Sequence, residues 1–242
     1  MRSWSAAGMV KARPRPGFVG TVAAVLVASA CGSRGFSNLA SGAVCDPNAA
    51  AFTLNIDNPF FPLPVGHRIV LEGSEGGREL LVRMTVLDEV EVVDGVPTRV
   101  VEEYEAADGT VVEVSRNYFA QAEDGTVCYF GEEVDIFGSG GDVTSHHGAW
   151  RADGEGNRPG IFMPATLRIG QAFQQEGALG VAEDQARVIA LDERIEVPAG
   201  TFTNTATLMD RNPLDGSQGI KVYARGIGLI VDEAAGMTSF SP

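Results

Sequence analysis

Hydrophobic and polar residues alternate along LLVRMTVLDEVEVV, residues 80–93. One face of this segment carries Leu80, Val82, Met84, Val86, Val90 and Val92. The opposite face carries Arg83, Thr85, Glu89 and Glu91. A period of two over this length predicts a β-strand with one buried face and one solvent-exposed face. Asp88 interrupts the apolar face, which predicts a bulge or bend there.

A second alternating segment is RVIALDERIEV, in which Ile189, Leu191, Ile195 and Val197 share one face. Valine, tyrosine, phenylalanine and threonine mark further strands. These are HRIVLEG, VVEVSRNYFAQ, TVCYFG, TNTATLMD and IKVYARGIGLIV. VPAG, residues 197–200, predicts a turn between two strands. Helical periodicity is weak throughout, so we expect at most a short helical turn.

The Asp-Gly dipeptide, which suits tight hairpin turns, occurs five times, beginning at residues 94, 108, 124, 153 and 215. Strand-like segments of about a dozen residues separate the first three, as in an antiparallel meander. We therefore predict an all-β or nearly all-β fold, in which the meander closes into a barrel or half-barrel; the alternative is a two-sheet sandwich. Residues 51–242 are expected to form a single domain.

Residues 1–30 have the features of an export signal. A basic region ends at Arg15, and the apolar run that follows, residues 17–30, is shorter than the roughly 20 residues of a membrane-spanning helix. Translation starts at Met1 or Met9. VASAC resembles a bacterial lipobox, which makes Cys31 the lipid-modified first residue of the mature protein, although the usual branched aliphatic residue is Ala28 here. The alternative is a plain A-x-A cleavage site that leaves Cys31 unmodified, so that the protein is secreted or periplasmic. Residues 31–50, small and polar, are expected to form a flexible tether.

The chain of 242 residues has a formal net charge of −14. Removing residues 1–30 leaves 14 basic against 32 acidic residues, a net charge of −18. Such a protein repels nucleic acid and anionic lipid, so neither is an expected partner. It suits cationic ligands or divalent ions, although charge of this kind also serves solubility alone.

Two of the three histidines are adjacent in SHHGAW, as His146 and His147. Neighbouring side chains of a strand point to opposite faces, so the two cannot share one metal there, and no usual zinc spacing follows. We expect a structural segment with Trp150 buried and at least one histidine exposed. Paired acids occur at residues 102–103, 132–133 and 183–184, but in a chain this acidic they do not identify a site. We expect no catalytic residue, metal site or cofactor.

Lys221 is the only lysine after Lys11, and strand alternation places it on one face with Tyr223. Such a cluster could hold an anionic ligand at a barrel mouth. A structural ion pair with one of the many carboxylates is the competing interpretation. His146, His147, Trp150, Lys221 and Tyr223 are the residues that we expect to face a ligand, if one binds.

Several phrases together resemble a family of exported bacterial proteins, often lipoproteins, for which no activity is established. They include NPFFPLPVGHRIVLEG, NYFAQAEDGTVCYFGEEVDIF, SHHGAW, RPGIFMPATLRIGQAFQQE, VPAGTFTN and KVYARGIGLIVDE. The likeness extends from about Asn58 to Glu233. It implies export and a single domain, and it implies an aromatic residue at the position of Cys128.

The remaining cysteines are Cys45, at the end of the tether, and Cys128, within TVCYFG. In an oxidising compartment they pair with each other, pair with a partner protein or stay free. A cysteine in place of a packing residue makes most sense if it gains a bond, so we predict a Cys45–Cys128 disulfide. The alternative is a buried free Cys128.

Taken together, these features predict a cell-envelope lipoprotein, anchored to the membrane through Cys31. Its β domain is expected to bind a small apolar or amphipathic ligand, or a partner protein, without catalysis. One alternative is a metal-assisted hydrolase that uses the region of His146 and His147 with nearby carboxylates. Another is a structural envelope protein without a ligand.

Overall fold

The computed structural model of the protein describes residues 36, 39–40 and 42–242. The predicted signal peptide (residues 1–30) and Cys31 lie outside the described residues. No helix within the described part is long and apolar enough to cross a membrane.

Apart from the short 3-10 helix η1 (Gly42–Cys45), the elements are β-strands. In chain order they are β1 (Phe52–Thr53), β2 (Arg68–Glu75), β3 (Arg78–Val93), β4 (Val96–Ala107), β5 (Thr110–Ala122), β6 (Val127–Phe137), β7 (Val143–Ser145), β8 (Trp150–Arg151), β9 (Gly160–Met163), β10 (Ala172–Gln174), β11 (Gln185–Leu191), β12 (Ile195–Val197), β13 (Gly200–Phe202), β14 (Thr205–Arg211), β15 (Gln218–Ala224), β16 (Gly228–Asp232) and β17 (Ala235–Ser241).

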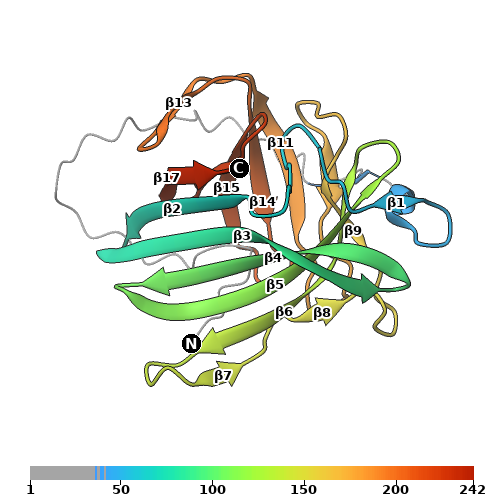
Figure 1. Ribbon diagram of the computed structural model, residues 1–242, viewed down its shortest axis with the longest axis horizontal. Helices are drawn as coiled ribbons and strands as arrows, with labels where there is room; N and C mark the ends of the chain where they lie inside the picture. Colours follow the sequence, from blue (N-terminus) through green and yellow to red (C-terminus); the bar gives the residue numbers. More distant parts are fainter. Residues whose placement is uncertain (1–35, 37–38, 41) are drawn as a thin grey trace.

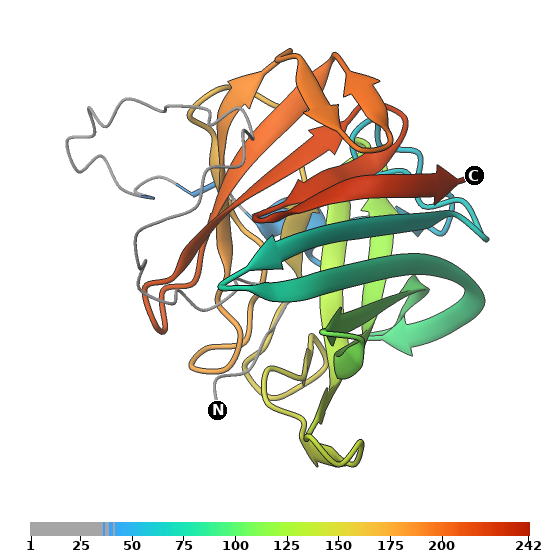
Figure 2. The ribbon, with the colours of Figure 1, turned by 90° about the vertical axis from the view of Figure 1, so that its left-hand side faces the viewer.

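One large antiparallel sheet contains all strands except β12 and β13, which pair with each other. Its order is β10-β11-β14-β15-β16-β17-β2-β3-β4-β5-β6-β7, with β1 on β5 and with β8 and β9 on β6. The long strands β3–β6 cross the lower half of Figure 1, whereas β11, β14 and β15 run at a steep angle to them. Figure 2 shows the same change of direction from the side. The sheet therefore curls, and its two halves enclose a common interior.

The two ends of the curled sheet meet without forming a ladder between the described strands. The backbone nitrogen of Arg158, just before β9, donates to the carbonyl of Gly177, just after β10, at 3.1 Å. Gly160 permits this approach, because a Cβ there would lie 2.0 Å from the carbonyl oxygen of Gln175. The predicted, nearly all-β antiparallel fold is thus confirmed. The described strands do not form a closed barrel; the fold is a half-open barrel or a sandwich whose two layers belong to one sheet.

Two of the Asp-Gly dipeptides form the predicted tight hairpins. Asp94-Gly95 joins β3 to β4 and Asp108-Gly109 joins β4 to β5. All four residues have φ between 51° and 76°, the left-handed region that this turn requires. The predicted turn at VPAG also forms, between β12 and β13.

The bulge predicted at Asp88 occurs, and its consequence corrects the predicted face of β3. The register against β4 shifts between Val86 and Val90. The inserted residues reverse the alternation, so Val90 and Val92 are exposed (49% and 56%), whereas Val93 is fully buried. The prediction of one common apolar face was therefore correct only as far as Val86.

Two predicted strands are each divided. RVIALDERIEV is interrupted at Asp192, which has a φ of 59°, so β11 ends at Leu191 and β12 belongs to the small sheet. The buried residues of β11 are Ala186 and Val188, rather than Ile189; after the register shift between Val188 and Ala190, Leu191 packs against the core. IKVYARGIGLIV forms two strands, β15 and β16, around a tight turn.

The tether expected over residues 31–50 ends earlier than expected. Leu39 forms a parallel bridge to Ala172, and Cys45 is 1% exposed. Cys45 and Cys128 are joined by a disulfide, with their Cα atoms 5.6 Å apart. Residues 42–50 therefore belong to the folded domain, because the disulfide fixes them against β6.

The apolar end of the interior is filled. Phe61, Phe119, Tyr129 and Phe162 form a group of ring contacts with centroids 4.5–5.7 Å apart. The cavity beside them, lined by residues that include Phe61, Leu63 and Met84, has a volume of only about 10 Å³.

Candidate functional site

The two adjacent histidines lie on the surface, in the turn between β7 and β8, and both are exposed. The Nδ1 atom of His146 lies 2.8 Å from the carbonyl oxygen of Val134 and 3.0 Å from a carboxylate oxygen of Asp135. Trp150 is buried at 4% exposure and packs edge-on against Tyr129. The described residues contain no group of three or more His, Cys, Asp and Glu side chains arranged to hold a metal ion.

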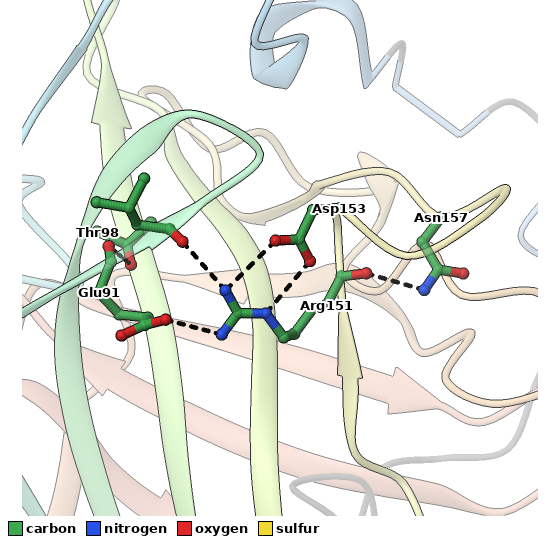
Figure 3. Close-up of polar contacts among 6 residues, drawn as sticks. Glu91, Thr98, Arg151, Asp153 and Asn157 are labelled. Carbon is green, nitrogen blue, oxygen red and sulfur yellow. Dashed lines mark hydrogen bonds and ion pairs between the residues drawn. The ribbon is translucent and has the colours of Figure 1, made fainter.

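Arg151, the residue that follows SHHGAW, has a structural role (Figure 3). The Arg151 guanidinium on β8 pairs with Glu91 at 3.0 Å and with Asp153 at 3.2 Å, and it donates to the carbonyl of Val92 at 3.0 Å. These contacts fasten the β3–β4 hairpin to β8. Arg151, at the end of SHHGAWR, therefore holds these strands together.

The most unusual chemistry lies inside the curled sheet. Seven carboxylate side chains there are at most 9% exposed, and we call them the buried acidic cluster: Glu103, Glu105, Glu113, Glu132, Glu176, Asp184 and Asp210. Lys221, which is 9% exposed, lies in the same interior and contacts Asp210. Acidic residues are almost never buried without partners, because desolvation of a charge costs several kcal/mol.

Strands β4 and β5 place three members side by side. Glu105 lies directly opposite Glu113, and Glu103 lies opposite Ser115. Like charges directly opposite each other in an antiparallel pair are destabilising. The Glu105–Glu113 pair therefore needs protons or a cation between its carboxylates.

A bulge in β6 brings Glu132 into the same interior. Asn117 pairs with Glu132 and Phe119 with Tyr129, so two residues of β6 oppose one residue of β5. Gly131 occupies the bulge with a φ of 131°, and a Cβ there would lie 2.3 Å from the carbonyl oxygen of Trp150. Tyr129 and Glu132, three residues apart, consequently both point inward, which simple alternation forbids.

Lys221 projects from the opposite half of the sheet. It lies opposite Asp232 in the pairing of β15 with β16. Its Nζ atom is 3.7 Å from a carboxylate oxygen of Asp210 and 4.0 Å from one of Asp232. The structural ion pair proposed for Lys221 is therefore present. The side chain of Asp232 is 18% exposed, so the cluster reaches solvent here.

The two remaining members, Glu176 and Asp184, lie near the two ends of the loop between β10 and β11. The backbone nitrogen of Asp184 donates to a carboxylate oxygen of Glu176 at 3.1 Å. Glu132 interacts electrostatically with Glu176, Glu113 and Glu103, which links this edge to the strands β4–β6. The cluster is thus continuous across the interior.

Several oxygen atoms of the cluster have no hydrogen-bond partner. They are both carboxylate oxygens of Glu132 and one oxygen each of Glu113, Asp184 and Asp210. The Tyr129 hydroxyl lies near Glu132, but it donates its single proton to the side-chain oxygen of Asn117 at 2.5 Å. Glu132, 1% exposed, is therefore a desolvated acceptor at the centre of the interior.

Desolvation raises the pKa of these carboxyl groups, and neighbouring carboxylates add to the effect. The pKa of Glu113 rises to about 9, through desolvation and then repulsion by Glu103. That of Asp184 rises to about 9, through desolvation and then repulsion by Glu176 and Asp210. Glu176 reaches about 7 and Asp210 about 6, with desolvation the main cause and Lys221 opposing it in both. The folded protein therefore retains protons on Glu113 and Asp184 at neutral pH, whereas Glu176 is partly ionised there and Asp210 is largely ionised.

Stability is expected to fall as the pH rises from 5 to 8. Unfolded carboxyl groups titrate near pH 4, whereas Asp210, Glu176 and Glu113 titrate at about 6, 7 and 9 in the folded protein. Between these limits the folded state binds more protons, so deprotonation favours unfolding. We expect the Tm to drop by about 5–10 °C over this range, measured by circular dichroism. Glu113→Gln should flatten the dependence; a constant or rising Tm of the unmodified protein would contradict the argument.

The sequence analysis found only part of this site. Lys221 and Tyr223 do face the interior, and both are buried, but His146 and His147 are exposed in the turn between β7 and β8. Each acidic pair dismissed as uninformative contributes one buried member, namely Glu103, Glu132 and Asp184. Alternation from the buried Val101 would have identified Glu103 and Glu105, whereas the bulge conceals Glu132.

No protein-family model, curated protein or solved structure matches this chain. The resemblance to exported bacterial lipoproteins consequently stays a prediction, and the inference of function starts from the buried acidic cluster. The Cys45–Cys128 disulfide is compatible with an exported protein, because disulfides persist in oxidising compartments.

Proposed function

We propose that this chain is a cell-envelope protein, anchored through lipid on Cys31, whose β domain binds a small organic cation in the buried acidic cluster. The observation that carries the proposal is Glu132, which is 1% exposed and has no partner for either carboxylate oxygen. A ligand that supplies positive charge and N–H donors satisfies this group and relieves the repulsion around it.

The distribution of acceptors supports a ligand with more than one amino group. Unpartnered oxygens occur on β5 (Glu113), on β6 (Glu132), before β11 (Asp184) and on β14 (Asp210). A ligand with one ammonium group can bind only one or two neighbouring carboxylates, whereas a diamine or polyamine can bind carboxylates on different strands at once. The filled apolar end, with its cavity of about 10 Å³, favours this class over the apolar ligand expected from the sequence.

The exposed fractions in the cluster indicate a route for entry. Asp232 is 18% exposed at its side chain, and Glu103, Glu105 and Lys221 are each 9% exposed. Glu132 and Glu113, at 1% and 2%, lie deeper. A cation therefore meets the shallow carboxylates first and the unpartnered ones afterwards. Non-catalytic binding is the simplest use of such a site.

Isothermal titration calorimetry with putrescine and spermidine tests the proposal on the purified mature protein. Glu132→Gln keeps the shape of the side chain and removes its charge, so we expect the Kd to rise at least about tenfold, which corresponds to about 1.4 kcal/mol. Glu133→Gln is the matched control, because Glu133 is the next residue and is exposed. Its Kd should match that of the unmodified protein.

Further arms of the titration separate charge from other effects. The uncharged analogue 1,4-butanediol should not bind. Amine binding at pH 7 should release protons from the cluster, seen as a dependence of the heat on the buffer's ionisation enthalpy. Absence of binding by either amine, or equal binding by the Glu132→Gln and Glu133→Gln variants, would reject this function and favour a structural envelope protein.

A further inference from the structure

Two loops leave the large sheet at the same end. They are residues 175–184, between β10 and β11, and residues 212–217, between β14 and β15. The flanking residues are in register across the sheet, because Gln174 pairs with Gln185, Gln185 with Arg211, and Arg211 with Gln218. Both loops lie at the lower left of Figure 2.

These loops present apolar side chains to solvent. Leu179 is 86% exposed, and Val181 and Leu214 are each 46% exposed. Leu179 occupies the tip of a tight turn that closes through hydrogen bonds from the backbone nitrogens of Val181 and Ala182 to the carbonyl of Ala178. The turn therefore holds the leucine away from the protein core, where burial would contribute about 1.5–3 kcal/mol.

The predicted lipid anchor is tied to the same end of the sheet. The Arg211 guanidinium lies 5.6 Å from the ring centre of Phe36, and Leu39 bridges to Ala172. Cys31 is five positions before Phe36, and a fully extended chain over that distance spans at most about 18 Å. The attachment point of a lipid on Cys31 therefore lies within about 18 Å of Phe36, which contacts Arg211 at the start of the 212–217 loop.

We propose that Leu179, Val181 and Leu214 insert into the surface of the bilayer that carries the anchor. This inference rests on the proposed lipid anchor at Cys31. The partner is a zwitterionic lipid surface, because the loops carry the acids Glu183 and Asp215 and the domain is strongly acidic. Shallow insertion of apolar side chains adds to lipidation and fixes the orientation of a tethered domain.

Tryptophan fluorescence measures this insertion. The mature chain has one tryptophan, Trp150, which is 4% exposed, so a second one reports its own surroundings. The lipidated full-length protein with Leu179→Trp is reconstituted into phosphatidylcholine vesicles that contain brominated acyl chains. We expect a blue-shifted emission and at least about twofold more bromine quenching than for Val92→Trp. Val92 is 56% exposed on the β3–β4 hairpin and serves as the control.

A flotation assay on the same vesicles separates failure of the anchor from failure of the inference. Intact mass should show a diacylglycerol group on the mature protein, and Cys31→Ser should abolish flotation. Flotation with equal quenching of the Leu179→Trp and Val92→Trp variants would overturn the insertion of the loops and leave the anchor standing. An unmodified mass without flotation would overturn both.

Discussion

Replacing Lys221 with methionine is expected to lower the free energy of unfolding by about 3–5 kcal/mol at pH 8, because it leaves buried carboxylates without their counter-charge. Lys221 lies between Asp210 and Asp232, at 3.7 Å and 4.0 Å. It also lowers the pKa of Glu103 and Glu176, against the larger effect of desolvation. Its removal therefore acts on the whole cluster rather than on one ion pair. Urea denaturation monitored by circular dichroism gives the change.

The same substitution should cost less at pH 5, because protonation then replaces the lost lysine as the means of neutralising Asp210. Arg225→Met is the matched control, since Arg225 directly follows β15 and is exposed; its effect should stay within about 0.5 kcal/mol. A loss of less than about 1 kcal/mol for Lys221→Met at pH 8, or a larger loss at pH 5 than at pH 8, would contradict the proposed role.

The fold class was predictable because local chemistry and tertiary structure agree over most of the chain. Asp94-Gly95 and Asp108-Gly109 favour tight hairpins wherever they occur, and both sit between strands with alternating side chains. Loop length and turn type then determine the register between β3, β4 and β5. Such information lies within a dozen residues, so a single sequence contains it.

The errors occur where extra residues in one strand change the phase of alternation. After the shift between Val86 and Val90, the apolar residues of the expected face point to solvent. The bulge at Gly131 has the opposite effect and brings Glu132 inside. A bulge needs a changed backbone conformation at only one or two residues, and its position depends on what the neighbouring strand accommodates. Alternation alone does not reveal it.

The candidate site was hidden by the acidity of the chain. With 32 acidic residues, the seven buried ones do not differ in type from those on the surface. The buried residues differ from the others in that they lie close together in the folded protein. They come from β4–β6, from the β10–β11 edge and from β14, which are distant in sequence and which the curled sheet brings together. Lys221 could be identified from the sequence, because it is the only lysine of the mature chain.

Removal of the Cys45–Cys128 disulfide is expected to lower the free energy of unfolding by about 2–5 kcal/mol. The bond joins residues that are 83 positions apart, and for a loop of this length the chain-entropy argument gives an upper value of about 4.5 kcal/mol. Both cysteines are at most 1% exposed, so the side chains themselves pack in the core. Cys45→Ala combined with Cys128→Ala therefore also creates a small cavity.

The m-value of urea denaturation and a measurement under reducing conditions distinguish the effect of the lost cross-link from the effect of the lost packing. Without the cross-link the unfolded chain is less compact, so the m-value should increase along with the loss of stability. The unmodified protein under reducing conditions is the control, because both thiols then keep their volume in the core and only the bond is lost. A similar loss for the reduced protein assigns the effect to chain entropy. Full stability of the reduced protein, with an unchanged m-value, would show that residues 42–50 hold their place on β6 through packing alone.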